Sequence, residues 1–251
     1  MSILDTFDPH SPEILTPSHI AAPVENCPEV FIAAFKEQVL DLIRQNYGAE
    51  EIGSVNAAFV RVPVYRFSYH GHILGCYPTL LGGPAAVGVL EELIVMGLQK
   101  LLVFGSCGAL DKALTAGHLI IPSEAYRDEG TSYHYLPPSD YVEIPTAPRL
   151  KEILDGLGVP NIMGRVWTTD AIYRETADNC RKRREEGCLA VEMECASLAA
   201  ASRFRGVEFY QFLYAADCLD GAGWDARLLG NMPAEGWEKY LRIALEAAIR
   251  L

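Results

Sequence analysis

The chain has 251 residues, of which 50% are hydrophobic and 22% are charged. This composition supports a sizeable core and excludes global disorder, and the length suits one α/β domain. The 33 acidic and 21 basic residues give a net charge of −12, which excludes binding to a nucleic-acid backbone or an anionic membrane surface by bulk charge.

The seven cysteines stand singly, without a CxxC pair or a Cys/His spacing typical of a zinc site. An odd number of scattered thiols favours a reducing compartment over a disulfide framework. The start of the chain lacks the apolar stretch of a signal peptide, and no run approaches the roughly 18 apolar residues of a membrane span. We therefore expect a cytoplasmic protein without a metal site, which binds neither nucleic acid nor membrane.

Residues 1–28 contain five prolines and predict an extended arm. We expect residues 29–251 to form a single α/β domain. From Glu29 the apolar residues recur at helical spacing, which predicts a helix that ends at Gly48.

The rest of the chain alternates between strand-like and helix-like segments. His70-Gly71 predicts a hairpin turn between two β-like runs, and short apolar runs predict strands buried in a sheet. We expect strands at 57–69, 72–80, 101–104, 119–121, 162–168, 189–191 and 209–215, and helices at 85–96, 148–157, 177–186, 194–204 and 234–251. This order predicts an α/β fold with a mixed, mostly parallel central sheet flanked by helices.

The segment Gly105-Ser106-Cys107-Gly108 follows the predicted strand 101–104. Ligands of such sheets bind at the carboxyl ends of the strands, so this segment is a candidate binding site. Its two glycines would let the backbone turn and bring N–H groups to an anion. A tight turn without a ligand is an equal alternative.

Carboxylates follow three later strands. Asp170 comes after a pair of threonines, Glu192 and Glu194 flank Met193, and Asp217 follows the strand 209–215. A carboxyl group at such a strand end is a common general acid or base. The alternative is a structural role at the start of the next helix or turn, where the same residue types are favoured.

Three segments in this order resemble the nucleoside phosphorylase family, which includes purine nucleoside phosphorylase of the hexameric type, uridine phosphorylase and the nucleosidases. The resemblance runs from about Val64 to the end of the sequence. The segments are Gly82-Gly83-Pro84 through Gly108, Arg127-Asp128-Glu129-Gly130-Thr131-Ser132, and Val191-Glu192-Met193-Glu194 followed by Asp217. Their combination is specific, whereas each segment alone is not.

The resemblance implies a role for each matching residue. Gly105 and Ser106 would face phosphate, Met193 and Glu194 would hold the ribose, and the base pocket would consist of Thr169, Ile172, Val191, Asp217 and Arg227. Asp217 matches the acid that protonates N7 of a purine, with Arg227 as its possible partner. The implied reaction passes through a cation-like ribosyl transition state, which carboxylates stabilise. No metal or organic cofactor is implied, and inorganic phosphate is the co-substrate.

Two phosphate contacts of the family are absent from the sequence. A Gly-Asp-Pro-x-Arg segment is not found, and Val103 stands where the family places an arginine. Arg61 is the first candidate to replace them, because it falls near the place of an arginine that a neighbouring subunit contributes; Arg66 and Arg127 are others. Without a replacement water would be the nucleophile, since burying an unpaired phosphate costs several kcal/mol per charge.

The sequence therefore predicts a nucleoside phosphorylase, a pentosyltransferase that produces free base and pentose 1-phosphate. The alternatives are a hydrolytic nucleosidase, a uridine-type phosphorylase and, as a non-enzyme, a nucleoside binder. Asp217 and the absence of the uridine-type Gln-x-Arg motif favour a purine, and the presence of both Glu194 and Asp217 argues against a binder. The resemblance also implies a homo-oligomer, a hexamer or a dimer, in which the arm or the region 57–66 completes a neighbour's pocket.

Overall fold

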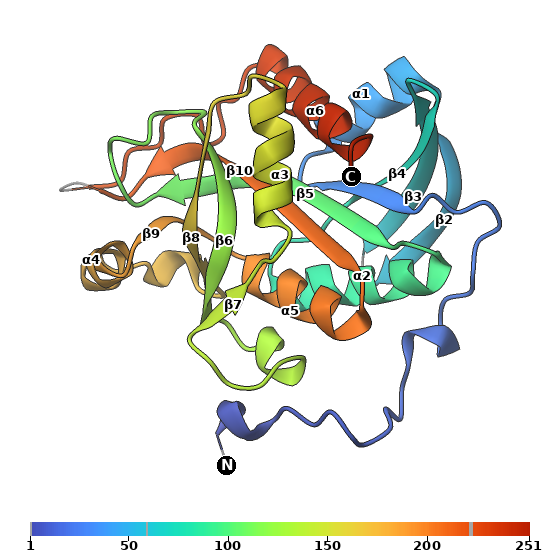
Figure 1. The fold of residues 1–251 in the computed structure, drawn as a ribbon, viewed down its shortest axis with the longest axis horizontal. Helices are drawn as coiled ribbons and strands as arrows, with labels where there is room; N and C mark the ends of the chain where they lie inside the picture. The colour runs from blue at the N-terminus through green and yellow to red at the C-terminus, as the bar shows by residue number, and fades with distance from the viewer. Residues whose placement is uncertain (1, 59, 221–222) are drawn as a thin grey trace.

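A broad mixed sheet lies between two layers of helices in the computed structural model, which describes residues 2–58, 60–220 and 223–251 (Figure 1). The strands are β1 (Val30–Ala34), β2 (Glu50–Ala57), β3 (Val60–Tyr69), β4 (His72–Pro78), β5 (Lys100–Ala109), β6 (Leu119–Asp128), β7 (Tyr141–Glu143), β8 (Asn161–Thr169), β9 (Cys188–Glu192) and β10 (Glu208–Cys218). The helices are α1 (Glu37–Tyr47), α2 (Gly83–Met96), α3 (Ala147–Gly156), α4 (Ala177–Glu185), α5 (Cys195–Arg205) and α6 (Ala234–Ala248). Short 3₁₀ turns are η1 (Ile3–Asp5), η2 (Pro17–His19), η3 (Thr131–His134) and η4 (Ile172–Arg174).

Strand β5 is central, with β1 and β10 parallel to it on its two sides. Beyond β1 the sheet continues through β4, β3 and β2. On the other side the pairings β5–β10, β10–β6, β6–β8, β8–β9 and β9–β5 close a ring of strands. The expected mixed sheet is confirmed. Fewer neighbouring strands are parallel than the alternation of strands and helices predicts. The pairs β2–β3, β3–β4, β10–β6, β5–β9 and β6–β7 are antiparallel.

Helices α1, α3 and α6 cover one face of the sheet, and α2 and α5 pack together on the other (Figure 1). The core between these layers is apolar and tightly packed; for example, the rings of Phe104 and Phe212 stack across β5 and β10 at 5.4 Å between centroids. Within the described ranges, no helix has the length and apolar character needed to cross a membrane.

The helix expected from Glu29 is wrong in its first part, where residues 30–34 form β1 and the helix begins only at Glu37. The apolar run Val30-Phe31-Ile32 lies between β4 and β5 and is buried by both layers, so it has no polar face to distinguish a strand from a helix. Gly48 ends α1 as expected, with φ at 59°. Strand β2 was not expected, because its largely polar residues lie at the edge of the sheet.

The turn expected at residues 105–108 is also wrong. Strand β5 continues through these residues to Ala109, because β10 pairs with it along nearly its whole length. The two glycines instead mark places where neighbours approach closely. A Cβ at Gly105 would lie 2.8 Å from the ring of Phe35, and one at Gly108 would lie 2.4 Å from Leu219.

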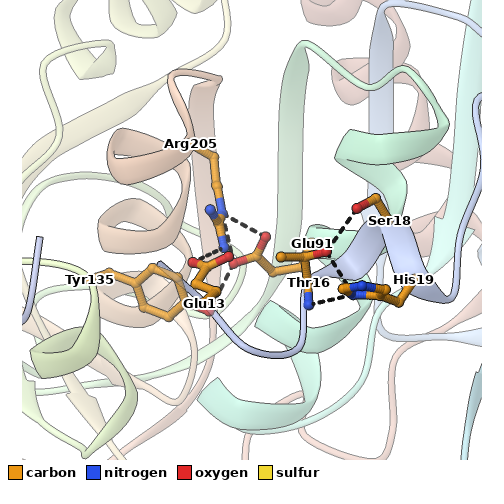
Figure 2. Close-up of polar contacts among 7 residues, drawn as sticks. All are labelled: Glu13, Thr16, Ser18, His19, Glu91, Tyr135 and Arg205. Atoms are coloured by element: carbon orange, nitrogen blue, oxygen red, sulfur yellow. Dashed lines mark hydrogen bonds and ion pairs between the residues drawn. The ribbon is translucent and has the colours of Figure 1, made fainter. Parts of the chain in front are cut away.

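The N-terminal arm lies along the helical layer of α2 and α5 (Figure 1). Figure 2 shows one of its attachments, in which Arg205 at the end of α5 forms ion pairs with Glu13 of the arm and Glu91 of α2. The hydroxyl of Tyr135 donates to the same Glu91 carboxylate at 2.9 Å. The arm is therefore joined to both helices through one arginine.

Candidate active site

The closed ring of strands brings the predicted site residues to one place. Asp217 of β10 pairs with Gly108 of β5, and Gly108 pairs in turn with Val191 of β9. Strand β8 continues the row, with Thr168 opposite Glu192. Residues that are far apart in the sequence thus stand side by side on four neighbouring strands.

Glu192 is buried, and it serves the start of helix α5. Its carboxylate accepts the N–H groups of Glu194 and Cys195, each at 2.8 Å, and the hydroxyl of Thr168. A negative charge at a helix N-terminus is favoured by the helix dipole and by the unpaired N–H groups. For Glu192, the structural role that the sequence left open as an alternative therefore applies.

Glu194 is 4% exposed and points across to the start of helix α2. Its carboxylate accepts the N–H of Gly82 at 2.6 Å. Burial and the neighbouring charge of Glu192 raise the pKa of Glu194. Since a carboxylate offers about four acceptor positions, Glu194 retains capacity for hydroxyl groups of a ligand.

Glu129 is a third buried carboxylate, which the sequence did not single out as a site residue. It accepts the hydroxyl of Ser197 at 2.5 Å and the N–H of Ser132 at 2.9 Å. Its charge raises the pKa of Glu192, so the two carboxylates act on one another. In the sequence it stands only as part of the segment 127–132 that resembles the family, and nothing there distinguishes it from its neighbours.

Gly83 lets the start of α2 approach this cluster. A Cβ at Gly83 would lie 2.3 Å from the Ser197 hydroxyl oxygen and 3.2 Å from that of Thr131. A side chain would force α2 away, because contacts under 3 Å are sterically excluded. The glycine pair that begins α2 is therefore needed to hold the Gly82 N–H at Glu194.

Asp217 is 9% exposed and lies beside a bulge in β10. The indole N–H of Trp224 donates to its Oδ2 at 2.7 Å. Burial raises the pKa of Asp217, and this indole hydrogen bond opposes the rise. The other oxygen, Oδ1, lies 3.4 Å from the point that a Cβ would occupy at Gly108.

The structure does not join Arg227 to Asp217 by a hydrogen bond. Its guanidinium donates to the Asp225 carboxylate and to the carbonyl of Leu114, and its charge lowers the pKa of Asp217 only through space. The chain after β10 turns back so that Cys218 and Asp225 form a bridge, which directs Arg227 elsewhere. Trp224 holds the place expected for the arginine.

The remaining predicted base and ribose residues differ in exposure. Val191 is 3% exposed and Thr169 is 2% exposed, and the Thr169 hydroxyl accepts the N–H of Ala171 at 3.2 Å. Met193 is half-buried between the two glutamates, and Ile172 is an exposed residue of η4.

The arginines considered for phosphate are engaged elsewhere. Arg61 on β3 forms an ion pair with Glu51 on β2, and β3 is three strands from β5 in the sheet, or about 14 Å at the usual strand spacing. Arg66 forms an ion pair with Glu50, and Arg127 is buried and donates to Ser132. Within the described part of this chain, none of the three hydrogen-bonds to Ser106.

A cavity of about 170 Å³ lies beside Ser106. Lys36 and Gln38 line it from the start of α1, Tyr214 from β10 and Trp237 from α6. Lys36 directly precedes α1, whose first N–H groups favour an anion. The cavity therefore combines a hydroxyl, a cation and a helix N-terminus, which together suit a small anion.

A family model described as "Phosphorylase superfamily" matches residues 29–245. A guanosine phosphorylase of Halorubrum lacusprofundi is 30% identical over 146 residues, covering 56% of this chain and 59% of that protein. A purine nucleoside phosphorylase DeoD-type of Bacillus cereus is 30% identical over 187 residues, covering 73% of this chain and 78% of that protein.

Two further matches complete the comparison. An uncharacterized protein of Acanthamoeba polyphaga mimivirus is 30% identical over 65% of this chain and 60% of its own length. The chain thus spans less than two thirds of two of these relatives. The crystal structure of uridine phosphorylase from Vibrio fischeri ES114 has a TM-score of 0.75 at 22% identity, covering 96% of this chain and 100% of that one, which shows a shared fold.

Proposed function

The chain belongs to the phosphorylase superfamily, and on this premise we propose that it is a nucleoside phosphorylase acting on purine nucleosides. It cleaves the N-glycosidic bond with phosphate and releases the free base and pentose 1-phosphate. The observation that carries the proposal is the placement of two buried carboxylates on either side of β5, with Asp217 at the end of β10 and Glu194 just after β9, the two strands that both pair with β5. The relatives named guanosine phosphorylase and purine nucleoside phosphorylase support a purine.

Glu194 acts on the sugar. Its carboxylate, fixed by the Gly82 N–H, accepts the 2′ and 3′ hydroxyls of the pentose, and Met193 packs below the ring. Positive charge develops on the sugar as the glycosidic bond breaks. Burial raises the pKa of Glu194 and Glu192, and the developing positive charge favours their ionised forms, which stabilise it. The low exposure of these groups strengthens that electrostatic effect.

Asp217 acts on the leaving base. A proton donated to the purine improves the leaving group, and burial raises the pKa of Asp217 toward the range in which it can donate. Val191 forms the wall of the base pocket, next to Gly108 and on the side of Oδ1 of Asp217.

Phosphate binds in the cavity beside Ser106, with Lys36 in place of the two arginine contacts that the sequence lacks. The support is the position of Lys36, an exposed cation at the wall of this cavity and at the start of α1. A charge-assisted contact of this kind offsets part of the cost of desolvating phosphate. This placement favours phosphorolysis over hydrolysis.

A panel of purine and pyrimidine nucleosides, incubated with and without phosphate, tests the proposal. We expect free purine and pentose 1-phosphate only when phosphate is present. Lys36→Ala should raise the KM for phosphate about tenfold or more, because hydrogen bonds to charged groups contribute roughly 1.5–3 kcal/mol. Lys36→Arg should restore it, and Lys182→Ala, on the exposed helix α4, is the matched control. Base release with free pentose and no phosphate dependence would overturn phosphorolysis in favour of the hydrolytic nucleosidase.

The proposed active form is a cytoplasmic homo-oligomer. The seven cysteines are all free thiols, which supports a reducing compartment. The exposed position of Arg61 on the outer strands leaves it available to a neighbouring subunit rather than to Ser106 of its own chain.

A further inference from the structure

We propose that Trp224 is a positioning residue of the reaction, which selects the oxygen of Asp217 that carries the proton to the base. The inference rests on the proposed function and adds a residue that neither the sequence motifs nor the comparisons indicate. It starts from the two different environments of the Asp217 oxygens.

The two oxygens of Asp217 face different partners. Oδ2 accepts the indole N–H of Trp224 at 2.7 Å. Oδ1 lies on the side of Gly108, where an added Cβ would lie 2.4 Å from Leu219, 3.1 Å from a methyl carbon of Val191 and 3.4 Å from Oδ1. Oδ1 is therefore the oxygen on the side of Val191, the residue proposed for the base pocket.

This arrangement decides where a proton on Asp217 resides. An indole N–H is a donor only, so its partner must be an acceptor. A neutral carboxyl group has one hydroxyl and one carbonyl oxygen, and the carbonyl oxygen is the stronger acceptor, so the contact with Trp224 favours the carbonyl at Oδ2. The hydroxyl is then at Oδ1, in position to donate to the purine.

The exposure of Trp224 indicates that packing does not explain its place. Trp224 is 63% exposed as a residue, whereas its partner Asp217 is 9% exposed. Tryptophan is usually well buried when it serves a core, and its N–H finds a partner there. Here the polar end is anchored inside while the ring remains largely in solvent.

The charged groups around Asp217 make this selection useful. Glu175, before α4, faces Asp217 and has a pKa raised to about 7 by burial and by the Asp217 charge. Asp225 raises and Arg227 lowers the pKa of Asp217, and the Cys107 thiol lies close on β5. Several neighbouring groups change the pKa of Asp217 through their charges. The uncharged indole N–H of Trp224 stays on Oδ2 throughout, and so fixes which oxygen of Asp217 carries the proton.

The test compares Trp224→Phe with the wild-type enzyme on two substrates, a purine nucleoside and a nitrophenyl riboside whose leaving group needs no acid. Rates are compared on the acidic side of the pH profile, where Asp217 is protonated in both proteins. We expect kcat/KM for the purine nucleoside to fall about tenfold, the scale of one misplaced catalytic contact. The nitrophenyl riboside should be cleaved at a rate within about twofold of the wild type, because it does not use the acid.

The pH profile gives a second readout. The indole N–H stabilises the ionised form of Asp217, so its loss raises the pKa of that carboxyl. The alkaline limb, where activity is lost as Asp217 deprotonates, should move to higher pH in Trp224→Phe. Trp224→Gln, which restores an N–H donor, should recover part of the rate and return the limb toward the wild-type position.

Three results would overturn the inference: an unchanged purine rate, an equal loss on both substrates, or an unmoved alkaline limb. Each of these requires that the wild-type enzyme cleaves both substrates, and each leaves the proposed function intact. A wild-type protein that releases no base from either substrate would overturn the proposed function, and this inference with it.

Discussion

Glu194 and Glu192 are two residues apart, yet they have different tasks. Glu192 is satisfied by the start of its own helix, whereas Glu194 reaches Gly82, which is 112 residues away in the chain. The orientation of Glu194 toward a ligand therefore depends on the packing of α2 against α5.

The substitution Glu194→Ala should reduce kcat/KM on ribosides about 100-fold or more, because the sugar loses the group that orients it. Steady-state kinetics with a purine riboside measures the effect. Glu143→Ala, an exposed glutamate on β7, is the matched control and should leave the rate unchanged. A Glu194→Ala variant with a kcat/KM near the wild-type value would remove Glu194 from the site.

The sequence indicated which residues are candidates for the site, but it did not show which of them contact one another. The acids at strand ends were found because a polar residue after an apolar strand is conspicuous. The sequence could not show which of Glu192 and Glu194 caps α5, nor that Trp224 rather than Arg227 contacts Asp217. Those facts depend on how distant segments approach, which spacing along one chain does not encode.

For single turns and helix ends, the predictions from sequence were correct where the residue type favours one particular backbone conformation. The hairpin at His70-Gly71 has φ values of 48° and 82°, as its turn type requires, and Gly97 ends α2 as expected. The helix predicted over β1 was wrong, because burial on both faces removes the polar–apolar periodicity there. The turn predicted at residues 105–108 was wrong, because strand pairing outweighs the tendency of glycine to form turns. Tertiary contacts decided both cases.

The attachment of the N-terminal arm gives a prediction at this scale. Arg205→Ala should lower the free energy of unfolding by about 1–3 kcal/mol, because it leaves the buried Glu91 carboxylate without its cation. It should also make the arm more accessible to limited proteolysis. Urea unfolding and proteolysis measure the two effects.

Glu13→Ala is the matched control for this substitution. It removes only the ion pair between Glu13 and Arg205, the more exposed of the two that Arg205 forms (Figure 2). Exposed ion pairs contribute about 1 kcal/mol or less. We expect the control to free the arm with little loss of stability. Equal losses of stability in the two variants would contradict the central role of Glu91.

At the scale of the whole molecule, the alternation of strands and helices predicted the α/β class, and the structure confirms it. The closure of β5, β10, β6, β8 and β9 into a ring was not predictable, because it depends on long-range pairings such as β5 with β9. That closure is what places Asp217, Gly108 and Val191 on neighbouring strands. The site is thus a product of topology more than of any single motif.

The proposed assembly gives a prediction at the same scale. We expect the active species to be a homo-oligomer, because Arg61 lies exposed on the outer strands, where it is available to the proposed phosphate site of a neighbouring subunit. Light scattering coupled to size-exclusion chromatography, run at the concentration of the activity assay, measures the mass of the active species. An active monomer under those conditions would refute this assembly.

The proposed mechanism divides the chemistry between two acids, because Asp217 acts on the base and Glu194 acts on the sugar. The most direct measurement is the ratio of kcat/KM for a purine nucleoside to that for a nitrophenyl riboside, determined for the wild type, Asp217→Asn and Glu194→Ala. We predict that Asp217→Asn lowers this ratio strongly, because only the purine needs an acid, and that Glu194→Ala slows both substrates alike and leaves the ratio unchanged. If Asp217→Asn slowed both substrates equally, Asp217 would have a structural role and the assignment of a purine would lose its main support.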